Sequence, residues 1–219
     1  MSLIRELMRS GNIDVDYLRR YTNSPWLVIR NPGEANDGLF LRDADGEPQV
    51  LDRLTGNVVS HRTKNISVAM NGEVPLDGGG VATPVFVIMT ETYMDDAYSP
   101  ESVTNTGGIS AARIRQFAAD LADAAFAKEV VINQPWTDWK GEKHETMVGR
   151  PVAMHSMRGI SAHSNGFQTC RALHVLQLML GSIEVPGGWR FKPPYPKPPE
   201  AHPKPAGKPS EIQAGKPLA

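Results

Sequence analysis

The chain has 219 residues, which is enough for one ordinary domain or two small ones with a buried core. Lysine and arginine number 23 against 24 acidic residues, so the composition offers no basic surface for nucleic acid or for an anionic membrane. The single cysteine, Cys170, excludes an intramolecular disulfide and any multi-cysteine metal or iron–sulfur site within this sequence.

The first thirty residues predict two short helices followed by a strand. Residues 3–9 carry apolar side chains at helical spacing, and Asp14 is placed to cap a second helix. The apolar run at residues 26–29 is typical of a short buried strand, which the turn residues 31–33 end. The N-terminal residues contain no signal-peptide core, twin arginine or apolar span, so we expect a cytoplasmic protein.

Turn signals dominate residues 38–72. Glycine follows aspartate, threonine or asparagine at positions 46, 56 and 72, and short β-type runs lie at residues 49–51 and 57–60. This pattern predicts a small antiparallel excursion of residues 38–72. The glycine triplet at residues 78–80 is predicted to be a plain loop, because a phosphate-binding loop follows a strand and opens a helix with a set glycine spacing.

Helices and one further strand are predicted between residues 85 and 132. Residues 85–94 are ambiguous, since their composition favours a strand whereas their apolar side chains also share one helical face. Ser99 and Ser110 each cap a helix, and we expect the apolar face of the second helix to pack on a sheet. Residues 130–132 form an apolar triplet typical of a buried strand. Because helix and strand alternate, the sequence predicts an α/β fold with a parallel, doubly wound sheet.

The most distinctive stretch is residues 157–166, a glycine-bearing turn just ahead of a predicted helix. It contains a guanidinium, an imidazole, an amide and hydroxyl groups, which suit a polar, phosphate-bearing ligand. Gly159 and Gly166 permit close approach, and Arg158 can pair with a phosphate or stack on a ring. The residue types alone favour the alternative, a polar turn that satisfies its own hydrogen bonds.

Neither a metal ligand nor a catalytic residue is predicted. His155 and His163 lie eight residues apart, with His144 further back, and no acidic residue falls between them at a familiar metal-binding spacing. Ser161 or Ser164 beside His163 lacks the strand-to-helix turn of a catalytic nucleophile.

The sequence ends with a core helix and a proline-rich tail. The apolar residues of 172–180 share one helical face, which is typical of core packing, and Gly181 ends that helix. Trp136 and Trp139 are predicted to cover an edge of the domain rather than to stack on a substrate. Nine of the 18 prolines lie in residues 193–219, so residues 191–219 are predicted to be an extended or disordered tail.

The order of four stretches resembles the molybdopterin oxidoreductase family, of the dimethyl-sulfoxide reductase type. The likeness is greatest to its sulfite dehydrogenase and polysulfide reductase catalytic subunits. The four stretches are residues 13–28, 98–109, 157–166 and 171–188. The third and fourth in tandem are the most specific part.

The resemblance implies a cofactor, which in this family is molybdenum held by two molybdopterin guanine dinucleotides. It implies that six residues contact this cofactor: Arg158, Gly159, Ser161, His163, Asn165 and Gly166. It also implies a helix at residues 85–93. Family catalytic subunits are several times longer and carry an iron–sulfur cysteine cluster and a molybdenum ligand that this chain lacks. The implied partners are therefore the missing remainder of the catalytic subunit, together with its iron–sulfur and membrane-anchor subunits, which would hold the protein at a membrane.

The sequence predicts three parts and leaves two hypotheses. Residues 1–155 are predicted to be a partial α/β domain, residues 156–190 a cofactor-proximal turn and helix leading into a second α/β domain, and residues 191–219 the tail. The first hypothesis is a fragment of a molybdenum oxidoreductase, inactive alone, whose parent transfers electron pairs or oxygen atoms on a small sulfur-type substrate. The second is a self-contained, non-catalytic binding protein that uses the α/β part and the tail.

Overall fold

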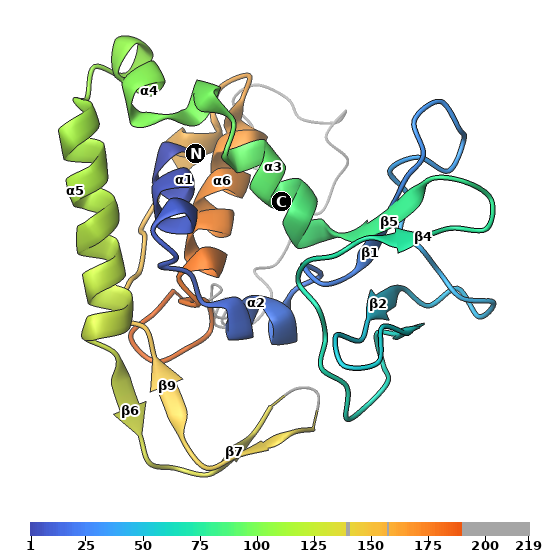
Figure 1. The fold of residues 1–219 in the computed structure, drawn as a ribbon. Helices are drawn as coiled ribbons and strands as arrows, with labels where there is room; N and C mark the ends of the chain where they lie inside the picture. The colour runs from blue at the N-terminus through green and yellow to red at the C-terminus, as the bar shows by residue number, and fades with distance from the viewer. Residues whose placement is uncertain (139–140, 157, 190–219) are drawn as a thin grey trace, which may run out of the picture. The chain divides into compact units, whose positions relative to one another are not determined.

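The helices of the chain share one hydrophobic core in the computed structural model, which describes residues 1–138, 141–156 and 158–189 (Figure 1). Helix α1 (Ser2–Arg9) contacts α3 (Val85–Tyr93), α5 (Ala111–Ala122) and α6 (Gly166–Met179), and α6 also contacts α2 (Val15–Tyr21). The core residues are Ile4, Leu7, Leu18, Met70, Tyr93, Leu121, Ala122, Ala125, Val152, Leu176, Met179 and Leu180. The apolar face of residues 172–180 is thus core, as predicted.

Local capping signals set the helix starts as the sequence predicts. The Asp14 carboxylate accepts a hydrogen bond from the Tyr17 amide at 2.9 Å, which caps α2. Ser99 caps α4 (Pro100–Gly107), and Ser110 caps α5 in the same way. Helix α4 ends at Gly108, whose φ of 69° is left-handed. Within the ambiguous residues 85–94, residues 85–93 are helical as α3, which confirms the expectation from the resemblance.

The packing of α5 differs from the prediction. Its buried residues Ile114, Ala118 and Leu121 lie on the expected apolar face, but α5 packs on the helices α1 and α4 rather than on a sheet. Phe117, on the same expected face, is 48% exposed. An apolar stripe specifies that a face is buried and not which layer covers it. Two short turns flank these helices: η1 (Asp96–Tyr98), and η2 (Asp123–Ala127), which continues α5.

Antiparallel pairing joins the strands between α2 and α3. Strands β1 (Leu27–Arg30), β5 (Val81–Pro84) and β4 (Val74–Pro75) form a three-stranded sheet in that order. Strands β2 (Gln49–Leu51) and β3 (Val58–Ser60) form an antiparallel hairpin, which lies within residues 38–72, where the sequence predicts an antiparallel excursion. The glycine triplet 78–80 is the loop between β4 and β5, as predicted.

The chain combines helices and strands, in keeping with an α/β class, but the predicted parallel, doubly wound sheet is wrong for the described residues. Strand β6 (Val130–Ile132) pairs antiparallel with β9 (Met147–Gly149), and β7 (Trp136–Thr137) with β8 (Lys143–His144). Parallel pairing of neighbouring strands needs a crossover, usually a helix. In this chain the connection from β1 to β5 is the antiparallel excursion, so β5 returns beside β1 in the opposite direction.

The described residues Met1–Trp189 form one compact unit. The division at residues 155 and 156 stays a prediction, as does a relation to the doubly wound domains of molybdopterin oxidoreductases. The predicted tail 191–219 lies outside the described residues, as does Trp139. Among the residues that are described, no helix combines the length and apolar character needed to cross a membrane.

Stability is expected to fall at alkaline pH because of Tyr17. Its hydroxyl donates to the Ile183 carbonyl at 3.0 Å, and burial, followed by the nearby Tyr21 and Asp14, raises the pKa of Tyr17 to about 12. The unfolded pKa is about 10, so folding favours the neutral phenol. This contribution is present below about pH 10 and is lost as pH rises through about 12. Urea unfolding at several pH values should show a decline in that window, and Tyr17→Phe should reduce it. An equally steep decline in Tyr17→Phe would contradict this origin.

Candidate functional site

The turn before α6 folds back on itself through its own backbone. It begins with a single 3-10 turn, η3 (Arg158–Ser161), in which the Ser161 hydroxyl donates to the Arg158 carbonyl at 2.9 Å. The Ala162 amide donates to the Gly159 carbonyl at 3.2 Å, and the Gly166 amide to the His163 carbonyl at 2.9 Å. These short-range bonds hold residues 158–165 directly ahead of the first turn of α6.

The two glycines of the turn have different environments. A Cβ added to Gly166 would lie 2.1 Å from the Ser161 carbonyl oxygen, so only glycine allows the chain to pass so closely there. A Cβ added to Gly159 would meet nothing within 4 Å. The sequence assigned both glycines to close approach of a ligand. In the structure, Gly166 serves the turn itself, whereas Gly159 has open space beside it.

Most of the polar side chains of the turn face solvent without protein partners. Arg158, His163 and Asn165 are exposed, and within the described residues no hydrogen bond or ion pair engages their side chains. Asn165 occupies the capping position of α6 but makes no capping hydrogen bond with its side chain. The first amides of the helix therefore lack the usual side-chain acceptor. Of the six predicted residues, only Ser161 uses its side chain within the turn, and the other internal hydrogen bonds of the turn are made by backbone groups.

The arrangement places several hydrogen-bond donors at a helix start that has no side-chain cap. A guanidinium, an imidazole, an amide and free backbone N–H groups all favour a negatively charged or oxygen-rich ligand, and the helix dipole acts in the same direction. No carboxylate belongs to residues 158–169, so no acidic side chain of this segment competes for these donors. The turn can therefore bind an anion, and the phosphate groups of a dinucleotide are anions of this kind.

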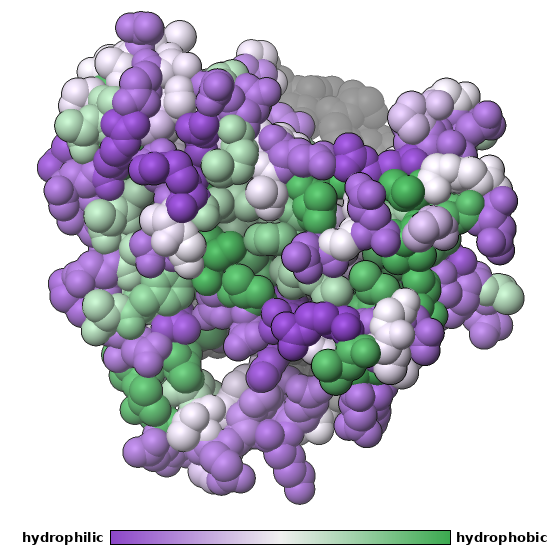
Figure 2. All heavy atoms as spheres, in the orientation of Figure 1, coloured by the Kyte–Doolittle hydropathy of each residue, from purple (hydrophilic) through white to green (hydrophobic). Residues whose placement is uncertain are grey.

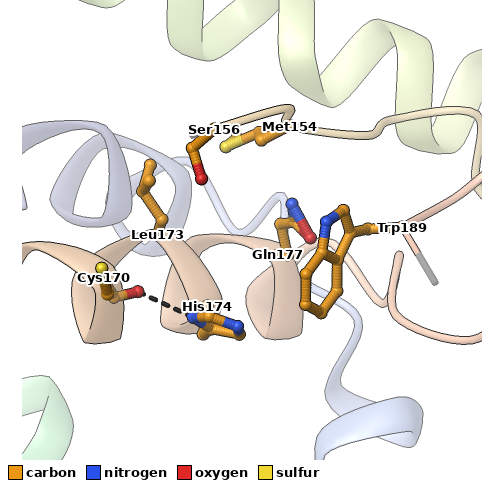
Figure 3. Close-up of a pocket in the computed structure, with 7 residues that line it drawn as sticks. All are labelled: Met154, Ser156, Cys170, Leu173, His174, Gln177 and Trp189. Carbon is orange, nitrogen blue, oxygen red and sulfur yellow. Dashed lines mark hydrogen bonds between the residues drawn. The ribbon is translucent and has the colours of Figure 1, made fainter. Parts of the chain in front are cut away.

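A small cavity lies one to three turns further along α6 (Figure 3). Its lining residues are Met154, Ser156, Cys170, Leu173, His174, Gln177 and Trp189, and its volume is about 40 Å³. The Nδ1 atom of His174 donates to the Cys170 carbonyl at 2.8 Å, and the rings of His174 and Trp189 lie nearly perpendicular with their centroids 5.0 Å apart. Gln177 is 3% exposed, and its Oε1 atom has no hydrogen-bond partner in the described structure. The cavity accommodates a molecule of solvent size, and a pterin does not fit.

Sequence reasoning missed this cavity because it assigned the whole face to core packing. The signal was present, since His174 and Gln177 interrupt the apolar residues at helical spacing. Cys170, the single cysteine of the sequence, is half-buried and lines the cavity.

A second group of chemically active side chains lies at the β7–β8 hairpin. Asp138, Glu142 and His144 offer atoms that all lie within 4.8 Å of one another. The Asp138 carboxylate, with 1% of the side chain exposed, contacts His144 Nε2 at 3.0 Å, and it accepts hydrogen bonds from the Glu142 amide at 2.9 Å and from the Tyr21 hydroxyl at 3.3 Å. His144 also stacks on Trp136. The buried carboxylate is thus engaged in bracing the hairpin, and His144 lies with Asp138 rather than with His155 or His163.

Comparison with known proteins shows a similarity to a sulfite dehydrogenase subunit. No protein-family model matches the sequence. Over 227 aligned residues, the chain is 37% identical to a sulfite dehydrogenase subunit of Allochromatium vinosum. The alignment covers 100% of this chain and 23% of that protein, so the chain spans about a quarter of the length of the curated relative it matches.

Proposed function

We propose that this chain contributes part of the cofactor-binding surface in the catalytic subunit of a molybdenum oxidoreductase. The complete subunit would act on a small sulfur substrate such as sulfite. The observation that carries this proposal is the 37% identity, along the whole of the chain, to a sulfite dehydrogenase subunit. The exposed donors at the start of α6 support the cofactor-binding role, because they suit the phosphates of a pterin guanine dinucleotide. The catalytic chemistry would belong to the complete subunit.

The donor set fits the phosphate part of such a cofactor. Arg158 would pair with phosphate oxygens, and its planar guanidinium permits two parallel hydrogen bonds. His163, Asn165 and the first amides of α6 would donate to the same anion or to its neighbour. The open space beside Gly159 leaves room for a phosphate or a ring against the backbone. When bound, the molybdenum bis(pterin guanine dinucleotide) group would supply the two-electron and oxygen-atom-transfer chemistry.

The remaining two predicted residues would position this donor set. The Ser161 hydroxyl donates to the Arg158 carbonyl, which fixes the backbone from which the guanidinium extends. Gly166 has no Cβ, so the chain can pass close to the Ser161 carbonyl, and α6 begins only three residues after His163. In this proposal the chain binds and orients the cofactor from one side, and neither a proton transfer nor a metal ligand is assigned to it.

The proposal also assigns partners. Cys170 is the single cysteine of the sequence, so an iron–sulfur relay cannot be built from its cysteines. Electrons would pass through clusters in the remainder of the catalytic subunit, then through those of an iron–sulfur subunit, and a membrane-anchor subunit would be a further partner. The cytoplasmic location expected from the sequence is part of the same proposal.

Binding of guanosine diphosphate (GDP) to the chain tests the anion site. GDP carries the guanine and pyrophosphate of the cofactor and can be titrated calorimetrically. We expect Arg158→Ala to weaken GDP binding about tenfold, which corresponds to the loss of one charge-assisted hydrogen bond. Arg158→Lys should retain part of the affinity, since it keeps the charge and loses the planar fork.

The matched control is Arg113→Ala on α5, because Arg113 is also exposed and lies on a different helix. This variant should bind GDP as the unmodified chain does. An equal loss in the Arg113 and Arg158 variants would indicate non-specific attraction of the anion. Absence of measurable GDP binding by the unmodified chain would contradict the proposed site.

A further inference from the structure

Strand β6 exposes apolar side chains on both of its faces. Val130 is 46% exposed, Val131 is 52% exposed and Ile132 is 36% exposed, and on the paired strand β9 Val148 is 38% exposed. Successive side chains of a strand point to opposite faces, so three consecutive exposed residues leave neither face covered. Figure 2 shows apolar side chains gathered at the lower left, where Figure 1 places β6 and β9.

One edge of β6 is also open. Within the described residues, β6 pairs with β9 alone, in a two-stranded sheet. The charged residues just before β6 are engaged within the chain, Lys128 with Asp123 and Glu129 with Arg150. Strand β6 is therefore uncharged and β-branched, with one unpaired edge and two faces that no other layer of the described residues covers. Such strands are typical of the interior of a larger sheet, and an exposed edge of this kind pairs readily with another strand.

The open edge and the two uncovered faces of β6 together indicate the kind of partner. A second copy of this chain pairing β6 with β6 would satisfy the open edge, but both faces of the enlarged sheet would still need a covering layer. A larger polypeptide can supply a strand and the layers together. The alignment to the sulfite dehydrogenase subunit leaves more than three quarters of that relative unmatched, so polypeptide of the required size accompanies the homologous stretch there.

We propose that β6 is the site at which this chain adds to a β-sheet formed by polypeptide equivalent to the unmatched part of a sulfite dehydrogenase-like subunit, whether on the same chain or on another. This proposal rests on the proposed function for the identity of the partner. The recognition is main-chain hydrogen bonding along the β6 edge, with apolar packing on Val130, Val131 and Ile132. Strand addition of this kind does not require the anion site at α6.

Site-specific photo-crosslinking in the cells that encode the protein tests the partner. Val131 is replaced by p-benzoylphenylalanine in the full chain, and crosslinked peptides are identified by mass spectrometry. We expect peptides homologous to the unmatched part of the relative. The control places the same crosslinker at Leu54, which is 77% exposed and lies between β2 and β3. Crosslinks from position 131 to a second copy of the chain or to an unrelated protein would overturn the proposal, and so would the absence of a crosslink.

A polar substitution provides an independent measurement. Val131→Thr keeps a β-branched side chain and removes apolar surface, so we expect about tenfold less co-purified partner, whereas Leu54→Thr should leave recovery unchanged. Equal recovery with both variants would contradict docking at β6. Arg158→Ala should retain the crosslink from position 131. If the unmodified chain does not bind GDP but still gives the crosslink, only the anion site is contradicted. If the unmodified chain binds GDP but gives no crosslink from position 131, only the docking strand is contradicted.

Discussion

Gly166→Ala is expected to lower the free energy of unfolding by about 1–3 kcal/mol, the usual cost of forcing an extra methyl group into a filled space. The added Cβ would lie 2.1 Å from the carbonyl oxygen, 2.5 Å from the carbonyl carbon and 2.7 Å from the Cα of Ser161. These atoms are backbone and cannot rotate aside, so the turn must open. Urea unfolding of the purified chain measures the effect.

The matched control for this prediction is Gly159→Ala in the same turn. The position has open space around it, and the expected change in unfolding free energy is within about 0.5 kcal/mol. Gly166→Ala should also weaken GDP binding, because it displaces the donors ahead of α6. Equal stability of the two variants would contradict the close approach at Ser161.

Arg150→Met is expected to cost about 3 kcal/mol, because it leaves the Asp14 carboxylate without its cation in a poorly solvated position. Both side chains are only 15% exposed, and Arg150 Nη2 and Nε lie 2.9 Å and 3.2 Å from Asp14 Oδ2. Arg150 also donates to the Ala125 carbonyl, pairs with Glu129 and lies over the Phe126 ring. One guanidinium therefore connects the end of α5, the β9 segment and the cap of α2.

The control for Arg150 is the exposed pair of Arg30 and Glu91. Arg30→Met should cost less than about 1 kcal/mol, since the two side chains are 40% and 51% exposed and water screens the pair. If Arg150→Met is too unstable to measure alone, the double variant with Asp14→Asn should recover part of the loss, because the uncompensated charge is removed while a capping side chain remains. Additive losses in the double variant would show that the two side chains do not depend on each other.

The exposure of β6 is the clearest difference between the sequence prediction and the structure. The apolar triplet 130–132 has the composition of a strand buried on both faces, yet it lies in a two-stranded sheet with its side chains in solvent. The composition of a strand reflects what covers it in the final assembly. An apolar run of this kind therefore predicts that the strand is covered. It does not predict whether the covering layer belongs to the same polypeptide.

The sequence by itself determined the features that depend on residues three or four positions apart. Asp14, Ser99 and Ser110 cap their helices as predicted. A capping side chain only has to accept a hydrogen bond from the backbone amide of the residue three positions later in the sequence. The polar, glycine-bearing turn before α6 was likewise recognised from its residues.

Only the tertiary structure decided which elements meet. It placed α5 on helices instead of a sheet, returned β5 antiparallel to β1, joined His144 to Asp138, and showed that Gly166 serves the turn while Gly159 borders open space. Each of these outcomes is a contact between two parts of the chain. The local sequence pattern shows that a surface is apolar or polar, or that a turn is close-packed, but it does not show which other residues that part contacts. The partner follows from how the whole chain closes around its core, which no short stretch of sequence encodes.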